Sequence, residues 1–217
     1  MAKVKVKKQE TFIDMTAMSD VTVLLLTFFM LTSTFVNPEP VQVATPSSVS
    51  EIKIPETNLL TILADSEGKI FMSLDNQNDK INTLVAVGED YGISFTPKQL
   101  DTFKRLTTFG VPIRFMSQFL DLPDDKQKEF LKDLKNMRVG IPTNDEEVRD
   151  GNVVISTDNE FKRWMSHATR INSELQIAIK ADRATTYPVV RDVMDDLREM
   201  RKNKYLLITS LKTASSE

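Results

Sequence analysis

The sequence predicts an α+β protein with one N-terminal transmembrane helix, a flexible Pro-rich linker and a small exported α+β domain. Three observations predict this fold class. Residues 21–36 carry no charge and, counted back through Met15, approach the roughly 20 apolar residues of a spanning helix. Residues 37–58 are rich in Pro, and the last forty residues follow a strand, helix and strand pattern.

Residues 1–12 form a basic tail with a net charge of +3, from four Lys and Glu10. The positive-inside rule places this tail in the cytoplasm and the C-terminal domain on the exported side, which predicts a single-pass membrane protein. Asp14 and Asp20 interrupt the zone where a cleavable signal peptide is apolar, and no small-residue cleavage site follows. Residues 13–36 are therefore predicted to be an uncleaved signal anchor.

Composition excludes several classes of function. The chain has 28 Lys and Arg against 31 Asp and Glu, a net charge of -3, so the part beyond the tail carries -6. A mildly acidic domain argues against a nucleic-acid partner. The absence of Cys excludes disulfides, thiol nucleophiles and thiolate metal sites. With six Gly in the chain, phosphate-binding glycine loops are absent as well.

Residues 37–58 are predicted to be a linker between the membrane anchor and the exported domain, because Pro38, Pro40, Pro46 and Pro55 favour extended backbone over packing. Within it, residues 49–54 alternate between apolar and polar side chains. This pattern fits a strand that is added to a partner sheet, including one swapped between protomers, and it equally fits a solvated linker.

Residues 59–217 form the predicted domain. Residues 59–64 and 69–74 read as a β-hairpin whose loop contains Gly68. Thr96 and Pro97 open a helix that stops before Gly110, and residues 113–120 form a short helix. A further helix follows residues 121–123, with its apolar face running through Leu134 to Met137. These helices lie in a segment of about 80–156, which we expect to be a mostly helical insertion.

The C-terminal third predicts a βαβ unit. Residues 157–160 resemble a capping box that opens a helix to about Ser173. A strand at 176–181, a helix at 188–201 and a strand at 205–211 follow. Such a unit is normally a right-handed crossover between parallel strands.

Asp20 is the candidate functional residue, because it stands at the start of the apolar run. A carboxylate at membrane depth is disfavoured by about 2.5 to 3.5 kcal/mol and normally faces a protein partner or a watery path. At 100° per residue, four side chains fall within about 40° of one another and form a polar seam: Thr16, Asp20, Thr27 and Thr34.

The polar seam has two interpretations. A carboxyl group is neutral in low-dielectric surroundings and charged in an aqueous half-channel, so Asp20 could carry protons while the hydroxyls support it. Alternatively, Asp20 caps the helix at the membrane interface and the hydroxyls bond only to their own backbone.

Other candidates for chemistry are weak. His167 is the only histidine, with no companion ligand, so neither a metal site nor a cofactor is predicted. Asp195 and Asp196 read as a solvated face. No catalytic residues are predicted, and the chain is not expected to be an enzyme. Five aromatic residues at helical spacing are predicted to be core: Phe103, Phe109, Phe115, Phe119 and Phe130.

Residues 13–21, followed by Leu25, Leu26, Phe29 and Met30, resemble the signature of the ExbD/TolR biopolymer-transport family. That signature is Asn-Val-Thr-Pro-x-x-Asp-Val before Leu-Leu-x-x-Phe-Met. Asp14 stands where Asn is usual and Ala17 where Pro is usual, and Asp20 aligns with the family's membrane aspartate. Residues 179–195 and 205–209 are similar to the family's periplasmic βαβ segment, whereas the insertion has no recognised counterpart.

The resemblance implies a proton-motive-force-coupled subunit of an inner-membrane motor that energises TonB-dependent outer-membrane transport, with Asp20 carrying the proton. It implies a homodimer, a multi-helix ring partner of the ExbB/TolQ type and a TonB-like periplasmic partner, with peptidoglycan as a further candidate. The alternative hypothesis is a signal-anchored periplasmic scaffold or cell-wall-binding stator without proton coupling.

Overall fold

The computed structural model describes residues 15–32, 47–48, 57–150, 153–208 and 210–211. The chain divides into two compact units, Met1–Pro38 and Glu39–Glu217. The described part of the first unit is one helix, α1, at Met15–Thr32. Among all the residues given above, no helix has the length and hydropathy that crossing a membrane requires.

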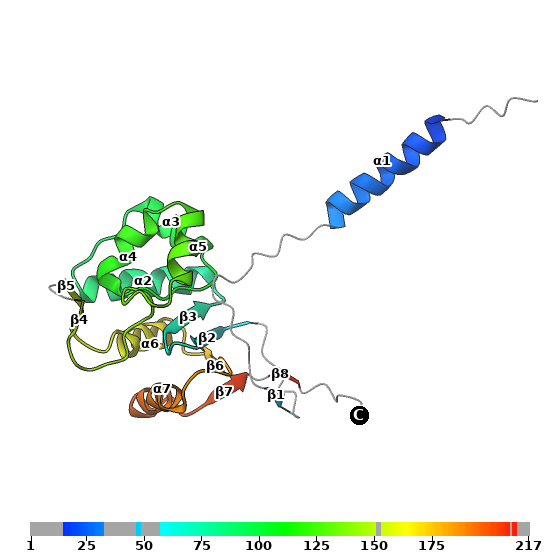
Figure 1. Cartoon of the computed structure of the whole chain (residues 1–217). Coiled ribbons are helices and arrows are strands. Elements are labelled where there is room, and N and C mark those ends of the chain that lie inside the picture. The colour runs from blue at the N-terminus through cyan, green and yellow to red at the C-terminus, as the bar shows by residue number, and fades with distance from the viewer. Residues whose placement is uncertain (1–14, 33–46, 49–56, 151–152, 209, 212–217) are drawn as a thin grey trace, which may run out of the picture. The chain divides into compact units, whose positions relative to one another are not determined.

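A four-stranded sheet in the order β3-β2-β6-β7 organises the second unit (Figure 1). The predicted hairpin is confirmed, since β2 at Leu59–Ala64 pairs antiparallel with β3 at Ile70–Leu74. Gly68 has a φ of 78°, as such a loop requires. On its other side β2 pairs in parallel with β6, at Gln176–Ala181, which in turn pairs in parallel with β7, at Tyr205–Ile208.

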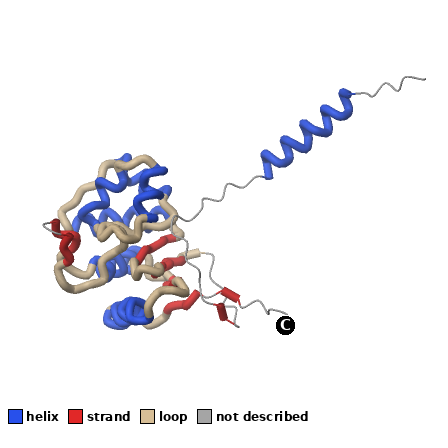
Figure 2. Tube along the Cα trace, in the orientation of Figure 1, coloured by secondary structure: helices blue, strands red, loops and turns tan. Residues whose placement is uncertain are grey.

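Six helices accompany this sheet in the described part of the unit (Figure 2). Helix α7 connects the parallel strands β6 and β7, which confirms the predicted βαβ unit. Helix α2 packs on α6 and on α3, and α3 packs on α4. The six helices are α2 at Gln77–Asp90, α3 at Pro97–Arg105, α4 at Ile113–Leu120, α5 at Asp124–Lys132, α6 at Glu160–Ile171 and α7 at Tyr187–Glu199.

Two short strand pairs complete the secondary structure of the described residues. β4 at Val148–Asp150 pairs antiparallel with β5 at Val153–Ser156. β1 at Ser47–Ser48 pairs in parallel with β8 at Ser210–Leu211, so the predicted strand at 205–211 is divided between β7 and β8. The alternating segment at 49–54 lies outside the described residues.

Helix ends follow their local signals with three exceptions. Helix α3 ends at Arg105 and does not continue to Gly110, because Leu106 has an extended conformation with ψ at 131°. Thr96 caps α3 in a capping box with Gln99, as expected. The prediction that the next helix continues to Met137 is wrong: α5 ends at Lys132, and Asp133 leaves the helical conformation with ψ at 74°. The predicted capping box at 157–160 is also wrong, because the N-cap of α6 is Asn159, whose side chain accepts from the Lys162 amide.

The aromatic core lies between the sheet and the helices. Phe109 pairs as a β-bridge with Met72, and its ring centroid is 4.9 Å from that of Trp164 on α6. Phe103 and Phe119 are buried as well, while Phe115 and Phe130 are partly buried against the core. The prediction that these five phenylalanines belong to the core is confirmed.

Candidate functional site

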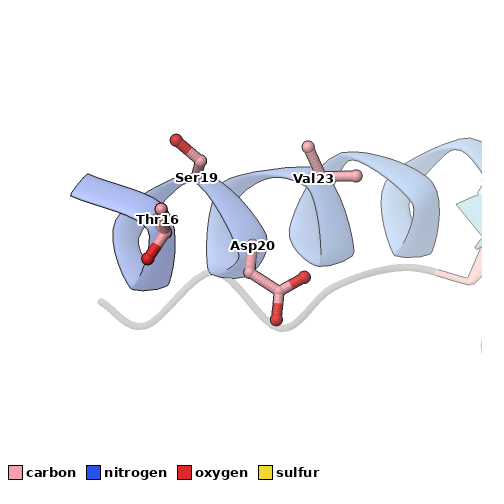
Figure 3. Close-up of a pocket in the computed structure, with 4 residues that line it drawn as sticks. All are labelled: Thr16, Ser19, Asp20 and Val23. Atoms are coloured by element: carbon pink, nitrogen blue, oxygen red, sulfur yellow. The ribbon is translucent and has the colours of Figure 1, made fainter. Parts of the chain in front are cut away.

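Asp20 lies within α1 and not at its end. The helix begins at Met15, so Asp20 is more than one full turn inside it and is not its N-cap. The capping part of the alternative interpretation is therefore wrong, whereas the Thr27 hydroxyl does bond to its own backbone, as that interpretation expects. Asp20 is exposed on α1 and lines an open hollow with Thr16, Ser19 and Val23 (Figure 3).

The described part of the polar seam lies on one side of α1. Figure 3 shows Thr16 and Asp20 projecting from the same side, one turn apart. The Thr27 hydroxyl donates to the carbonyls of Val23 and Leu24, at 3.0 and 2.9 Å. Its proton is thus engaged by its own helix, and its lone pairs remain available as acceptors. Thr34 lies outside the described residues.

The other described side chains of α1 are mostly large and apolar, interrupted by Ser19, Thr22 and Thr32. Its large apolar side chains are between 56 and 87% exposed, with Leu25 at the lower limit and Leu31 at the upper. Phe28 and Phe29 contact each other edge to face, with centroids 6.1 Å apart. So many exposed apolar side chains mark a surface that other molecules cover. Asp20 is the one ionisable side chain of α1.

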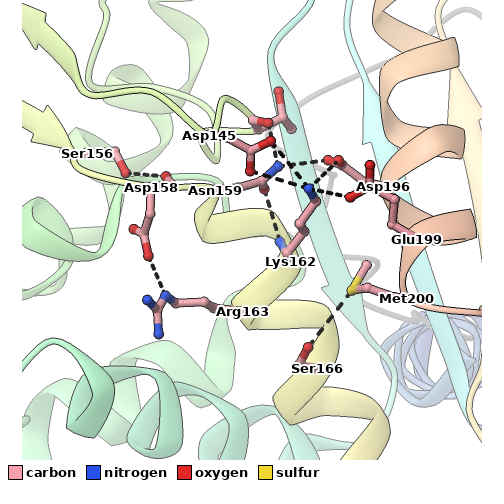
Figure 4. Close-up of polar contacts among 11 residues, drawn as sticks. Asp145, Ser156, Asp158, Asn159, Lys162, Arg163, Ser166, Asp196, Glu199 and Met200 are labelled. Atoms are coloured by element: carbon pink, nitrogen blue, oxygen red, sulfur yellow. Dashed lines mark hydrogen bonds and ion pairs between the residues drawn. The ribbon is translucent and has the colours of Figure 1, made fainter.

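A charged cluster joins α6 to α7 in the second unit (Figure 4). The Lys162 ammonium lies 2.8 Å from a Glu199 oxygen and 3.3 Å from oxygens of Asp145 and Asp196. The hydrogen bond to Glu199 is the main reason that the pKa of Lys162 is raised. The Asn159 amide donates to Asp196 at 3.0 Å.

Asp196 corrects the expectation of a solvated acidic face. Only 9% of the residue is exposed, and burial raises the pKa of its carboxyl group. It borders an open pocket with further acidic side chains, including Asp145, Glu146 and Asp192. Because its two oxygens are engaged by Lys162 and Asn159, Asp196 fastens α7 to α6.

His167 has partners on both ring nitrogens. The Arg170 guanidinium lies 2.9 Å from Nδ1, and a guanidinium can only donate, so Nδ1 is an acceptor. Nε2 therefore carries the proton and donates to Asp90 at 2.7 Å, which lowers the pKa of that carboxyl group. The contact ties α6 to the last residue of α2. Within the described residues no group of three or more His, Cys, Asp and Glu side chains could hold a metal ion.

A model of the family described as Biopolymer transport protein ExbD/TolR matches residues 6–212. No curated protein and no solved structure gives a significant match. The match begins before α1 and ends after β7, and it also spans the segment 80–156. Members of this family are transport-associated, non-enzymatic proteins that are typically associated with the inner membrane. Since the family model covers nearly the whole chain, the protein belongs to the ExbD/TolR family of biopolymer transport proteins.

Proposed function

We propose that this protein is the proton-motive-force-coupled subunit of an inner-membrane motor of the ExbB–ExbD or TolQ–TolR type, and that it energises TonB-dependent outer-membrane transport. Asp20 is the proton-carrying carboxylate in this proposal. The observation that supports it best is the position of Asp20 as the one ionisable group of α1, a helix whose large apolar side chains are exposed.

The proposed topology follows from charge and hydropathy. Residues 13–36, which include α1, form the signal anchor, with the basic tail at 1–12 in the cytoplasm. Residues 37–58 link it to the periplasmic domain at 59–217. In this topology the exposed apolar side chains of α1 are covered by lipid and by neighbouring helices.

The proposed mechanism uses the chemistry of a carboxyl group between two environments. Facing apolar surroundings the neutral form is favoured, and facing a watery path the charged form is favoured. Each proton that crosses the full membrane potential releases about 2.3 kcal/mol per 100 mV. Protonation and deprotonation of Asp20 in turn would then bias the rotation or shift of α1 against its partner.

The proposed partners follow from the family. They are a multi-helix ring protein of the ExbB/TolQ type around α1, a TonB-like protein in the periplasm and a second copy of this chain, with peptidoglycan as a further candidate. The polar seam of Thr16, Asp20, Thr27 and Thr34 is the face that we assign to the watery path or to a partner helix.

Substitution of Asp20 tests the proposal in cells that depend on this chain for TonB-dependent uptake. Asp20→Asn keeps the size and removes the titration, so we expect energy-dependent uptake to be abolished while the protein still inserts and co-purifies with its ring partner. Asp20→Glu should retain part of the activity. Asp101→Asn changes an exposed carboxylate on α3 and serves as the matched control.

Normal uptake by the Asp20→Asn variant would contradict proton coupling. It would favour the alternative, a signal-anchored scaffold or cell-wall-binding stator. If co-purification from mild detergent recovered only soluble periplasmic partners and no ring protein, that result would also favour the scaffold alternative.

A further inference from the structure

Glu160 is a fully buried carboxyl group that connects two helices of the domain. It is the first residue of α6 and has no exposed surface. One oxygen, Oε2, accepts a hydrogen bond of 2.9 Å from the amide of Ile113, the first residue of α4. Pro112, which precedes α4, makes no side-chain cap. Glu160 therefore caps α4 from a position 47 residues away in the sequence.

The second oxygen of Glu160 is buried without a hydrogen-bond partner among the described residues. Neither Glu160 Oε1 nor the Trp164 indole nitrogen one turn later has a hydrogen-bond partner within the described part of the chain. Trp164 is itself buried between the rings of Phe103 and Phe109, with centroid distances of 6.4 and 4.9 Å. Burial of the Glu160 side chain away from water favours its neutral carboxyl form over the carboxylate.

Few charged groups face Glu160 from the elements around it. The Ile113 amide, the Ser156 side chain and, most weakly, Arg114 on α4 favour the carboxylate, while Asp158 before α6 disfavours it. Tyr91, which follows α2, is neutral, and its hydroxyl donates to Asp158 at 2.6 Å. Burial is the dominant influence and raises the pKa of Glu160 to about 7.

We propose that Glu160 makes the junction of α4 and α6 a pH-sensitive latch, which is closed when the carboxyl group is protonated and loosened when it is ionised. Local opening of α4 would expose the carboxyl group to water and return it to its ordinary affinity for protons. The closed state then binds the proton more tightly than the open state, so raising the pH favours opening. The latch is independent of the proposed role of Asp20.

The same linkage gives the expected rise of the opening constant of α4 with pH. With a pKa of about 7 in the closed state and the ordinary 4.5 in the open state, the opening constant rises roughly 70-fold between pH 5 and pH 8. The limiting increase over a wider pH range is roughly 300-fold.

Hydrogen exchange at the amides of α4 measures this opening. Full-length protein in mild detergent is compared between pH 5 and pH 8, after correction for the intrinsic pH dependence of exchange. We expect the opening constant of the natural chain to rise by roughly 70-fold, and that of Glu160→Gln to stay flat. Glu174→Gln, at an exposed position, should behave like the natural chain.

Two outcomes would overturn the latch. One is a pH-independent opening constant in the natural chain, and the other is an equal rise in Glu160→Gln. If Glu160→Gln does not fold, Arg114→Gln decides the question, because Arg114 is exposed and favours the carboxylate. Its removal should move the rise in exchange to higher pH, and an unmoved rise would count against Glu160 as the titrating group.

Discussion

Replacement of Gly110 by Ala should destabilise the protein, although Gly→Ala at a compatible backbone position usually stabilises a protein. Gly110 follows Phe109, and its carbonyl accepts a hydrogen bond of 2.7 Å from the Gly140 amide, which holds the loop in place. A Cβ atom at this position would lie 2.2 Å from Cδ1 of Phe71 and 2.9 Å from two further ring atoms. Phe71 has no exposed surface, so its ring has no free space to move into.

Two opposing effects determine how much Gly110→Ala changes the free energy of unfolding. At a compatible backbone conformation, Gly→Ala stabilises a protein by about 0.4 to 1 kcal/mol through the unfolded state. Overpacking a filled core costs about 1 to 3 kcal/mol, and a contact of 2.2 Å with an enclosed ring lies at the upper end of that range. We therefore expect Gly110→Ala to lower the free energy of unfolding by about 2 kcal/mol.

Urea denaturation followed by the fluorescence of Trp164, the single tryptophan, measures this loss. The control is the same substitution in a Phe71→Leu background, where the smaller side chain removes the clash and Gly110→Ala should cost distinctly less. Equal costs in the two backgrounds, or a Gly110→Ala protein as stable as the natural one, would refute the steric argument.

Three further predictions use the same denaturation assay. Thr96→Ala removes the cap of α3 and should cost about 1 kcal/mol; an unchanged midpoint would show that the cap is dispensable. Asn159→Ala should cost more than Thr96→Ala, because Asn159 caps α6 and also donates to buried Asp196, and a smaller cost would contradict the role of that bond. Burial lowers the pKa of Lys80 to about 8 from its ordinary 10.5. The unfolded chain then binds more protons in this window, so stability should rise with pH from 8 to 10.5, and Lys80→Met should remove that rise.

Elements with short-range signals could be predicted from the sequence. The hairpin of β2 and β3 is encoded by two apolar runs around Gly68, and the start of α3 by Thr96 and Pro97. The bounds of α4 agree with the prediction at both ends, Ile113 and Leu120. In each case the residues that determine the structure are close together in the sequence.

Helix α2 shows why other elements were not predicted. Its buried face includes Lys80 and Thr83, which break the apolar periodicity of an amphipathic helix. The Lys80 ammonium donates to the carbonyls of Lys104 and Leu106 at the end of α3, more than twenty residues away. A lysine is accepted in this buried position only because of that tertiary contact, and no local pattern reveals it.

The candidate sites differ in the same way, because some are visible in a local sequence pattern and others depend on contacts between distant elements. Asp20 could be identified because a charge inside an apolar run is visible within one helix. The burial of Asp196 and Glu160 could not be predicted from the sequence, because their partners come from other elements or turns. These partners are Lys162 and Asn159 for Asp196, and Ile113 for Glu160. Glu160 was predicted to complete a local capping box, but its carboxyl group is directed to α4 instead.

In their proposed roles, Asp20 and Glu160 obtain low-dielectric surroundings in different ways, and this makes the two roles separable. Glu160 is enclosed by the fold of its own domain, so its titration should be visible in the isolated full-length chain. Asp20 is exposed on α1, so apolar surroundings can reach it only through lipid or partner helices. Asp20→Asn should therefore leave hydrogen exchange in α4 unchanged while it abolishes uptake. If Asp20→Asn instead altered exchange in α4, the two carboxyl groups would be coupled, and the independence assigned to the latch would be wrong.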